Sequence, residues 1–292
     1  MTADASSVWE FEAIGTRWQV QTAGVLPEQT REVVRALIER FDRAWSRFRA
    51  DSLVTALARG AGAVPLPPDG TAMLDLYTAV SAATDGAVNP LVGEVLARRG
   101  YDASYGFVDA GAAAAPADWR RRLSWDAGTL AVTVPALIDV GAVGKGRLVD
   151  LVAAAVDGPV VVDASGDLAV RGMAQRIALE HPYDPARAIG VWEVTDAALC
   201  ASAVNRRTWG DGLHHVLDAR TGEPVRTIAA TWAVAGTAMT ADAAATALFF
   251  DGGPAFAAAN AVSWVRMSTD GRVEWSPGCR AELFLGADSV ES

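Results

Sequence analysis

The sequence predicts a single compact α+β unit with mixed or antiparallel sheets and flanking helices. Three observations carry this prediction: a strongly amphipathic helix near the N-terminus, a last third rich in strand patterns, and no repeat or Ser/Pro-rich linker that divides the chain. The 292 residues are 51% hydrophobic and 21% charged, which is enough apolar sequence for a large core. Length alone fits one or two domains, so we expect one domain over residues 1–292 and keep a minor N-terminal lobe over residues 1–130 open.

The first elements follow from side-chain periodicity. Residues 8–22 alternate aromatic, polar and small side chains, which predicts two strands joined by a bend at Gly15. Apolar side chains recur at steps of three and four over residues 27–48 and again over 70–84, which predicts two helices that contribute to the core. The Asp-Gly and Asn-Pro pairs within residues 85–90 indicate turns.

The centre of the chain alternates strand and helix in a locally α/β manner, after a connector or short helix at residues 109–118. The predicted elements are a strand at 130–134, a glycine-rich loop at 138–146, a helix at 147–156 and a strand at 160–170. The last third predicts one helix, at 240–250, and otherwise strands at 188–194, 199–203, 214–218, 227–236, 263–268 and 273–275. We expect the final two strands to complete a sheet.

The charge balance excludes some functions. With 25 basic and 35 acidic residues the formal net charge is -10, so the protein repels phosphate backbones and anionic lipid surfaces, and we expect no nucleic-acid partner. No apolar stretch is long enough for a membrane span, and the first twenty residues lack the pattern of a signal peptide. The two cysteines have neither disulfide-framework nor metal-ligand spacing. We therefore expect a cytoplasmic protein.

A glycine-rich loop at residues 139–146 is the first candidate for a ligand site. Its three glycines permit left-handed backbone and close approach of a ligand, and the helix that follows can receive an anion at its first amides. Lys145 within it is the only lysine among the 25 basic residues. Gly146 stands where a P-loop requires Ser or Thr, which excludes that motif. The alternative is a purely structural turn between a strand and a helix.

Asp242 and Thr246 are the second candidate. Four positions apart on a predicted helix, a carboxylate and a hydroxyl share one face and both suit a hard cation such as Mg²⁺, with phosphate and water completing its ligands. Alternatively, Asp242 only complements the helix macrodipole and Thr246 packs.

The adjacent histidines His214 and His215 are the third candidate. Neighbours on a strand point to opposite faces, so one of them would serve a site as general base, and the alternative is a hydrogen-bonded structural histidine. With His181 as the only further histidine, a zinc site is poorly supported. Weaker signals are Ser46, Phe48, Arg49 and Ser52 after the first helix, and the Gly166-Asp167 pair.

Taken in chain order, these segments resemble the ApbE-type FAD:protein FMN transferases. The matching segments are residues 14–16, 46–52, 85–90, 139–146 with Asp150, 165–167, 214–222 and 242–246. The resemblance spans nearly the whole chain and implies a T-fold-like α+β domain. It also implies a reaction that splits FAD at its pyrophosphate, transfers FMN to a Thr or Ser hydroxyl of an acceptor flavoprotein, and releases AMP.

The resemblance also implies roles for individual residues. Mg²⁺ would be held by Asp242, Thr246 and the backbone carbonyl of Ala142, and would bridge the pyrophosphate of FAD. His215 would take the proton of the acceptor hydroxyl, and Lys145 would supply a cation beside the pyrophosphate. The family's contacts to FAD fall at Ile14, Gly15, Thr16, Phe48, Arg99, Gly100, Tyr101, Asp139, Lys145 and Val216.

Two departures from the family pattern keep a flavin-binding protein without chemistry open, and an FAD pyrophosphatase is a second alternative. Ala203 stands where many members have glycine, and Ala245 stands where some members offer a second acidic ligand. An FAD pyrophosphatase would use the same groups with water as nucleophile and yield FMN and AMP. A flavin-binding or flavin-delivery protein would hold FAD without chemistry. Only an acceptor protein separates transferase from pyrophosphatase, and release of AMP separates both from a binding protein.

Overall fold

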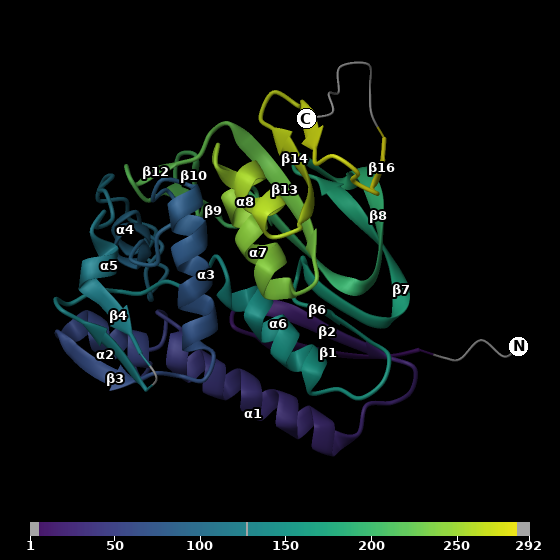
Figure 1. The fold of residues 1–292 in the computed structure, drawn as a ribbon, viewed down its shortest axis with the longest axis horizontal. Helices are drawn as coiled ribbons and strands as arrows, with labels where there is room; N and C mark the ends of the chain where they lie inside the picture. The colour runs from purple at the N-terminus through teal and green to yellow at the C-terminus, as the bar shows by residue number, and fades with distance from the viewer. Residues whose placement is uncertain (1–5, 127, 285–292) are drawn as a thin grey trace, which may run out of the picture.

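A single large sheet organises the structure, a computed structural model that describes residues 6–126 and 128–284 (Figure 1). Its order is β1-β2-β6-β7-β8-β13-β14-β15, with β16 also paired to β8, and the pairs are antiparallel. The strands are β1 (Ser7–Ala13), β2 (Thr16–Thr22), β6 (Val160–Asp163), β7 (Asp167–His181), β8 (Asp184–Ala203), β13 (Ile228–Ala235), β14 (Ser263–Ser268), β15 (Val273–Trp275) and β16 (Glu282–Leu283).

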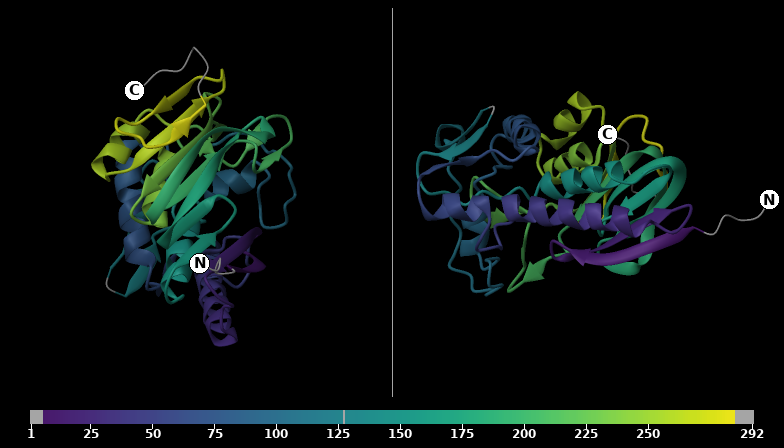
Figure 2. Two further views of the ribbon diagram at one scale, coloured as in Figure 1. Left: turned by 90° about the vertical axis from the view of Figure 1, so that its right-hand side faces the viewer. Right: turned by 90° about the horizontal axis from the view of Figure 1, so that it is seen from below.

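Helices cover one face of this sheet, as Figures 1 and 2 show. They are α1 (Glu28–Trp45), α3 (Gly70–Ala83), α6 (Gly144–Ala154), α7 (Ala238–Ala247) and α8 (Gly253–Ala259). The largest hydrophobic cluster lies between these helices and the sheet, and includes the fully buried side chains of Trp18 and Tyr77. A second cluster, around Trp192 and Trp232, gathers side chains of β7, β8, β13 and β14.

A smaller sheet stands beside the large one. It contains β3 (Gly62–Pro65), β5 (Thr129–Val132) and β4 (Leu123–Trp125), in that order. The short helices α2 (Leu53–Arg59), α4 (Gly93–Arg98) and α5 (Trp119–Arg122) lie on this side of the molecule, at the left of Figure 1. Two minimal strand pairs complete the structure: β9 (Thr208–Trp209) with β10 (Leu213–His214), and β11 (Leu217–Asp218) with β12 (Glu223–Pro224).

The predicted α+β class is confirmed, as are the two N-terminal helices and the final strand pair. The predicted order of strand, helix and strand around residues 130–170 is present as β5, α6 and β6. Its interpretation as locally α/β is wrong, because these strands pair antiparallel and no parallel βαβ unit forms among them. The strand predicted at 160–170 is a hairpin of β6 and β7, and the strand predicted at 214–218 is two separate two-residue strands. The domain bounds 1–292 and the lobe at 1–130 stay predictions, and residues 1–5, 127 and 285–292 lie outside the described residues.

Helices α6 and α7 are joined by hydrogen bonds at the start of α7. Asp150, in the middle of α6, accepts hydrogen bonds from the amides of Ala238 at 2.7 Å and Met239 at 3.0 Å. These amides have no partner within their own helix, so the carboxylate of one helix caps the other. The contact fixes the position from which α7 presents Asp242.

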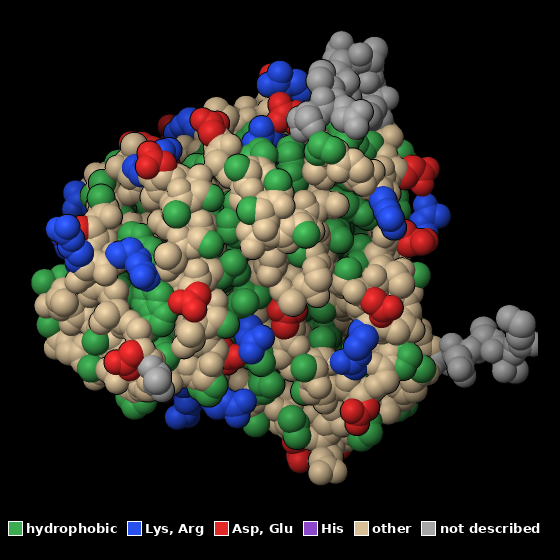
Figure 3. All heavy atoms as spheres, viewed as in Figure 1, with side chains coloured by type: hydrophobic (Ala, Val, Ile, Leu, Met, Phe, Trp, Pro, Cys, Tyr) green, Lys and Arg blue, Asp and Glu red, His purple; other side chains and the backbone are tan. Residues whose placement is uncertain are grey.

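The surface carries charges of both signs. On the face seen in Figure 3, acidic and basic side chains are interspersed and form no broad field of one sign. Within residues 6–126 and 128–284, none of the helices combines the length and the apolar character that a membrane crossing needs.

Candidate active site

A cavity of about 1040 Å³ collects most of the residues that the sequence singles out. Its walls come from the end of α1, the turns at 14–16 and 163–166, the loop at 139–142, the first turn of α6, and α7. The predicted site residues that line it are Ile14, Gly15, Thr16, Phe48, Tyr101, Asp139, Ala142, Lys145, His215, Val216, Asp242 and Thr246. Arg99 and Gly100 are not among its lining residues.

Two hairpin turns of the large sheet meet at this cavity. Ile14 and Gly15 join β1 to β2 with φ values of 47° and 72°, and Ser165 and Gly166 join β6 to β7 with 54° and 104°. Consecutive left-handed residues give the tight turns that match the twist of paired strands. The Ser165 hydroxyl donates to the Arg17 carbonyl at 2.9 Å, which ties the second turn to the first hairpin. A left-handed β-branched residue such as Ile14 is rare, and here it lies on the cavity wall.

The loop at 139–142 is held by its own side chain and by neighbours. Asp139 Oδ1 accepts a hydrogen bond from the Gly141 amide at 2.7 Å, and its Oδ2 accepts one from Arg47 Nε at 2.5 Å. The Tyr77 hydroxyl donates to the Asp139 carbonyl at 2.9 Å and accepts from the Ala142 amide at 3.2 Å. Helix α6 begins at Gly144, three residues before the predicted start, so Lys145 lies in its first turn.

The glycines of this loop serve packing. Gly141, Gly144 and Gly146 are absent from the positive-φ residues, so the expected left-handed backbone does not occur there. A Cβ at Gly146 would lie 2.3 Å from the Ala238 carbonyl oxygen, a backbone atom of α7. A Cβ at Gly144 would meet the Val140 side chain at 2.8 Å. Glycine at 146 therefore allows the close approach of α6 and α7.

Lys145 lies among buried carboxylates. Its Nζ is 3.1 Å from Asp167 Oδ2 and donates to the Ala164 carbonyl at 3.3 Å. Asp242 Oδ2 accepts a hydrogen bond from the Gly146 amide at 2.9 Å. Asp167 and Asp242 are 1% and 3% exposed, which makes the ammonium group the natural counterion of this cluster.

The pKa shifts follow from this arrangement. Burial, and then the neighbouring Asp167 carboxylate, raise the pKa of Asp242 well above its usual range. Burial also raises the pKa of Asp167, against the attraction of Lys145. Burial disfavours the charged amine of Lys145, yet Asp167 and Asp242 together raise its pKa. Asp167 and Asp242 are two buried carboxyl groups that share one cation, Lys145. Such a cluster favours binding of a second cation.

The donor set on α7 and the loop fits a hard cation. The carboxylate of Asp242, the hydroxyl of Thr246 and the carbonyl of Ala142 all belong to cavity-lining residues. The Gly146 amide donates to Asp242, and no hydrogen bond to the Ala142 carbonyl occurs within the described parts of the chain. In those parts no group of three or more His, Cys, Asp or Glu side chains is arranged for a metal. A cation here would thus rely on ligand oxygens or water, as Mg²⁺ commonly does.

The two adjacent histidines differ in environment. His214 Nδ1 accepts from the Val216 amide at 3.3 Å and Nε2 lies 2.9 Å from the Val225 carbonyl, so both ring nitrogens are occupied by backbone. His215 lines the cavity, and its buried Nδ1 has no hydrogen-bond partner among the described residues. Burial, and then the Arg207 guanidinium, lower the pKa of His215 to about 3. The imidazole is therefore neutral in the free protein.

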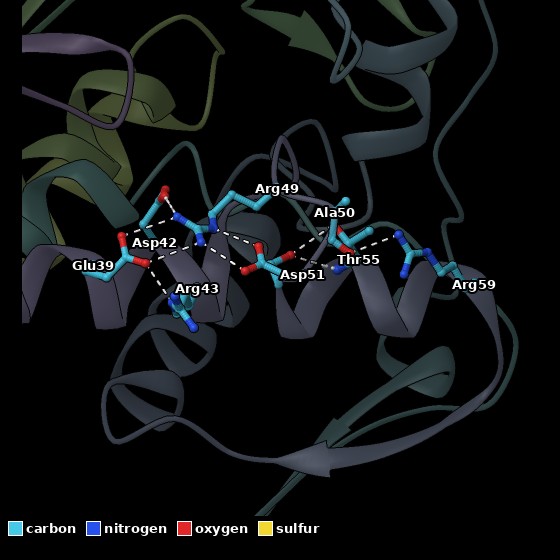
Figure 4. Close-up of polar contacts among 9 residues, drawn as sticks. Glu39, Asp42, Arg43, Arg49, Ala50, Asp51, Thr55 and Arg59 are labelled. Carbon is cyan, nitrogen blue, oxygen red and sulfur yellow. Dashed lines mark hydrogen bonds and ion pairs between the residues drawn. The ribbon is translucent and has the colours of Figure 1, made fainter.

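The segment at 46–52 joins α1 to α2 and is fixed by Arg49, as Figure 4 shows. Arg49 Nε is 2.9 Å from Asp51 Oδ1, Nη1 is 3.1 Å from Asp42 Oδ2, and Nη2 is 3.3 Å from Glu39 Oε1. With all its nitrogens facing carboxylates, Arg49 ties the segment to the last turns of α1. Arg47 and Phe48, which lie in this segment, are thereby held at the cavity wall.

Arg47 is a site residue that the sequence reasoning missed. It is 5% exposed, and besides Asp139 it donates from Nη1 to the Tyr101 carbonyl at 2.7 Å. Its guanidinium carbon lies 4.2 Å from the centre of the Phe48 ring and 4.9 Å from that of Tyr101. An arginine between Ser and Phe after a helix is typical of a solvated surface. In the structure the ion pair with Asp139 and the contacts with the Phe48 and Tyr101 rings hold this arginine inside.

Arg99 and Gly100 lie outside the cavity lining and contact residues that hold the ring of Tyr101 in place. Arg99 is 6% exposed, its Nη2 lies 3.4 Å from Glu223 Oε2, and its carbonyl accepts from Trp209 Nε1 at 2.7 Å. Gly100 has a φ of 98°, and a Cβ there would lie 2.7 Å from the backbone of Phe107. These residues position Tyr101, whose ring stacks on Trp209 at 5.3 Å, and it is Tyr101 that reaches the cavity.

Solved structures share this fold. The ApbE protein of Thermotoga maritima matches with a TM-score of 0.80 at 22% identity, covering 93% of this chain and 97% of that one. The flavin transferase ApbE of Vibrio cholerae matches with a TM-score of 0.76 at 22% identity, covering 93% and 97%. The apo form of the Pseudomonas stutzeri flavinyl transferase ApbE matches with 0.76 at 22%, covering 92% of each chain.

The sequence comparison extends this likeness to family membership. The ApbE family model matches residues 14–264, and the chain belongs to the ApbE family. An FAD:protein FMN transferase of Rhodobacter capsulatus is 28% identical over 321 residues, which cover 97% of this chain. The chain spans about 60% of the length of that curated relative.

Proposed function

We propose that this protein transfers FMN from FAD to a Thr or Ser hydroxyl of an acceptor flavoprotein and releases AMP. Membership of the ApbE family and the activity for which the Rhodobacter relative is named support this proposal. The observation that carries it is the shared cavity, which brings the neutral His215, the cation of Lys145 and the oxygen donors of α7 together.

The reaction balances as a displacement at phosphorus. The acceptor hydroxyl oxygen bonds to the phosphorus of the FMN half of FAD, and the bond from that phosphorus to the bridging oxygen breaks. AMP leaves with the bridging oxygen, and His215 accepts the hydroxyl proton. Burial is the main cause of the low pKa of His215 in the free protein, and the charges of Arg207 and Lys145 lower that pKa further. The negative charge of the bound pyrophosphate would offset the positive charges of Arg207 and Lys145. The pKa of His215 then rises, and the imidazole becomes a better base when FAD is bound.

Lys145 and the α7 donors act on the charge of the pyrophosphate. Mg²⁺, when bound by Asp242, Thr246 and the Ala142 carbonyl, would neutralise charge on the pyrophosphate and on the departing AMP. Lys145 places its ammonium group in the same cavity, and Asp167 orients it from 3.1 Å. Fixed opposite charges of this kind lower the barrier to phosphoryl transfer because they need no reorganisation during the reaction.

The decisive experiment incubates the purified protein with FAD and an acceptor domain that carries a Thr, with either Mg²⁺ or EDTA. AMP is quantified by chromatography and the acceptor by intact mass. We expect AMP and an acceptor mass increased by covalent FMN, both abolished by EDTA. AMP with free FMN and an unmodified acceptor would instead indicate a pyrophosphatase, and bound FAD without AMP a binding protein. No binding of FAD would contradict the flavin assignment itself.

Two variants test the assigned roles. His215→Ala is expected to keep FAD binding and to lose transfer by about 10²- to 10⁴-fold, the usual contribution of a positioned base. His181→Ala is its matched control, because His181 is not among the cavity-lining residues. Asp242→Ala is expected to abolish Mg²⁺-dependent transfer, with the exposed Asp251→Ala as control. Normal transfer by His215→Ala would remove the base role, and unchanged metal dependence in Asp242→Ala would place the metal elsewhere.

A further inference from the structure

Tyr77 connects the core of the protein to the loop at 139–142. It lies in the middle of α3 and is 1% exposed. Its hydroxyl donates to the Asp139 carbonyl at 2.9 Å and accepts from the Ala142 amide at 3.2 Å. A tyrosine hydroxyl has one O–H donor and acceptor lone pairs, so this group serves as donor and acceptor at once.

These two hydrogen bonds span the part of the loop that carries the ligand donors. Asp139 is held on its side-chain face by Arg47 and on its carbonyl by Tyr77. At the other end, the Ala142 amide donates to Tyr77, which sets the direction of the Gly141–Ala142 peptide. The next peptide, which carries the Ala142 carbonyl, is held by the hydrogen bond from the Val143 amide to the Val140 carbonyl at 3.1 Å. The amide that would ordinarily bond the Ala142 carbonyl in a helix, that of Gly146, is taken by Asp242. Tyr77 therefore holds Ala142 from its amide side, while the carbonyl of the same residue has no helical partner.

We propose that Tyr77 is a positioning residue for the divalent-cation site, acting through the Ala142 carbonyl. The inference rests on the proposed function, because that carbonyl is one of the three proposed oxygen donors. Groups that hydrogen-bond a metal-ligating segment from outside the ligand shell set its orientation, and their loss commonly weakens metal binding by about 10- to 100-fold. A phenylalanine fills the same space without the hydroxyl, so Tyr77→Phe removes only the two hydrogen bonds.

The test measures cation binding directly. Mn²⁺, which is visible by electron paramagnetic resonance, is titrated into wild type and Tyr77→Phe, in the absence and the presence of FAD. We expect Tyr77→Phe to bind Mn²⁺ at least about 10-fold more weakly than wild type. Hydrogen exchange followed by mass spectrometry should show faster exchange of the amides at 139–142 in the variant.

Ser81→Ala is the matched control. Ser81 lies one turn further along α3, is 5% exposed, and its hydroxyl accepts a hydrogen bond from Trp119 Nε1 at 3.1 Å, away from the loop. It should lower the melting temperature without changing Mn²⁺ affinity or exchange at 139–142. Equal weakening of Mn²⁺ binding in both variants would attribute the effect to general destabilisation and overturn the inference.

The remaining outcomes separate the inference from the proposed function. Wild type and Tyr77→Phe that bind Mn²⁺ equally would overturn the role of Tyr77 and leave the transferase proposal intact. A wild-type protein that binds no Mn²⁺ with or without FAD would contradict the metal part of the proposed function, and the role of Tyr77 with it.

Discussion

Gly146→Ala tests whether the contact of α6 with α7 sets the geometry of the site. A Cβ at residue 146 would lie 2.3 Å from the Ala238 carbonyl oxygen, whereas ordinary van der Waals contact begins at 3.4 Å. The carbonyl is backbone and cannot rotate away, so the helices must separate by about 1 Å in a densely packed interior. The same movement lengthens the 2.9 Å hydrogen bond from the Gly146 amide to Asp242.

The cost follows from three contributions. Overpacking of a core costs about 1–3 kcal/mol, and a lost hydrogen bond to a carboxylate costs about 1.5–3 kcal/mol. The better helix propensity of alanine offsets about 1 kcal/mol. We therefore expect the free energy of unfolding to fall by roughly 2–5 kcal/mol, and the melting temperature of a chain of this length by on the order of 3–8 °C.

Urea denaturation and scanning calorimetry measure this loss. Gly24→Ala is the control, because the methyl group that it adds would have no atom within 4 Å and the φ of Gly24 is not left-handed. That variant should stay within about 0.5 kcal/mol of wild type. If Gly146→Ala is equally neutral, the two helices are free to adjust and the packing explanation of this glycine is refuted.

Two further predictions concern buried charge. Arg47→Met should cost about 3–5 kcal/mol in unfolding free energy because it leaves Asp139 without its guanidinium, and a double-mutant cycle with Asp139→Asn that gives no coupling energy would contradict the pairing. For His215 the folded pKa of about 3 lies below the ordinary 6.5, so its stabilising contribution is complete above pH 6.5 and is lost as pH falls toward 3. The stability advantage of wild type over His215→Gln, from urea midpoints, should therefore shrink between about pH 7 and pH 4, and a constant difference would show a solvated imidazole.

Much of the fold was predictable from local sequence patterns, and the errors of that prediction have physical causes. The sequence predicts two strands, at 188–194 and 199–203, where the structure has the single strand β8. In the structure Asp196 has a φ of 47° and accepts a hydrogen bond from the Gly172 amide at 2.6 Å. The interruption is therefore a bulge inside a continuous hairpin, with the register of β7 and β8 shifted between Val170 and Ala174. A pattern within one strand does not reveal such a cross-strand contact.

Some residues of the candidate site could be predicted from the sequence and others could not. His215, Lys145 and Asp242 belong to residue types and spacings that stand out in a sequence, and the structure places them in one cavity. Of the two adjacent histidines only His215 lines the cavity, and the role of a histidine as base stays a prediction. The two residues differ because backbone hydrogen bonds occupy both ring nitrogens of His214, not because they alternate along a long strand. Tyr77 was unpredictable because helical periodicity marks it only as core, and its hydroxyl contacts a loop 62 residues away.

The presence of a single lysine gives this protein an unusual chemical selectivity. Every other basic side chain is an arginine, which keeps its charge and does not react with acylating reagents under mild conditions. Apart from the terminal amine, the only primary amine of the chain therefore lies at Lys145, on the wall of the cavity. The extent of amine labelling at Lys145, measured by mass spectrometry, thus reports whether the cavity is occupied. A bound ligand would lower the labelling of the single peptide that contains Lys145.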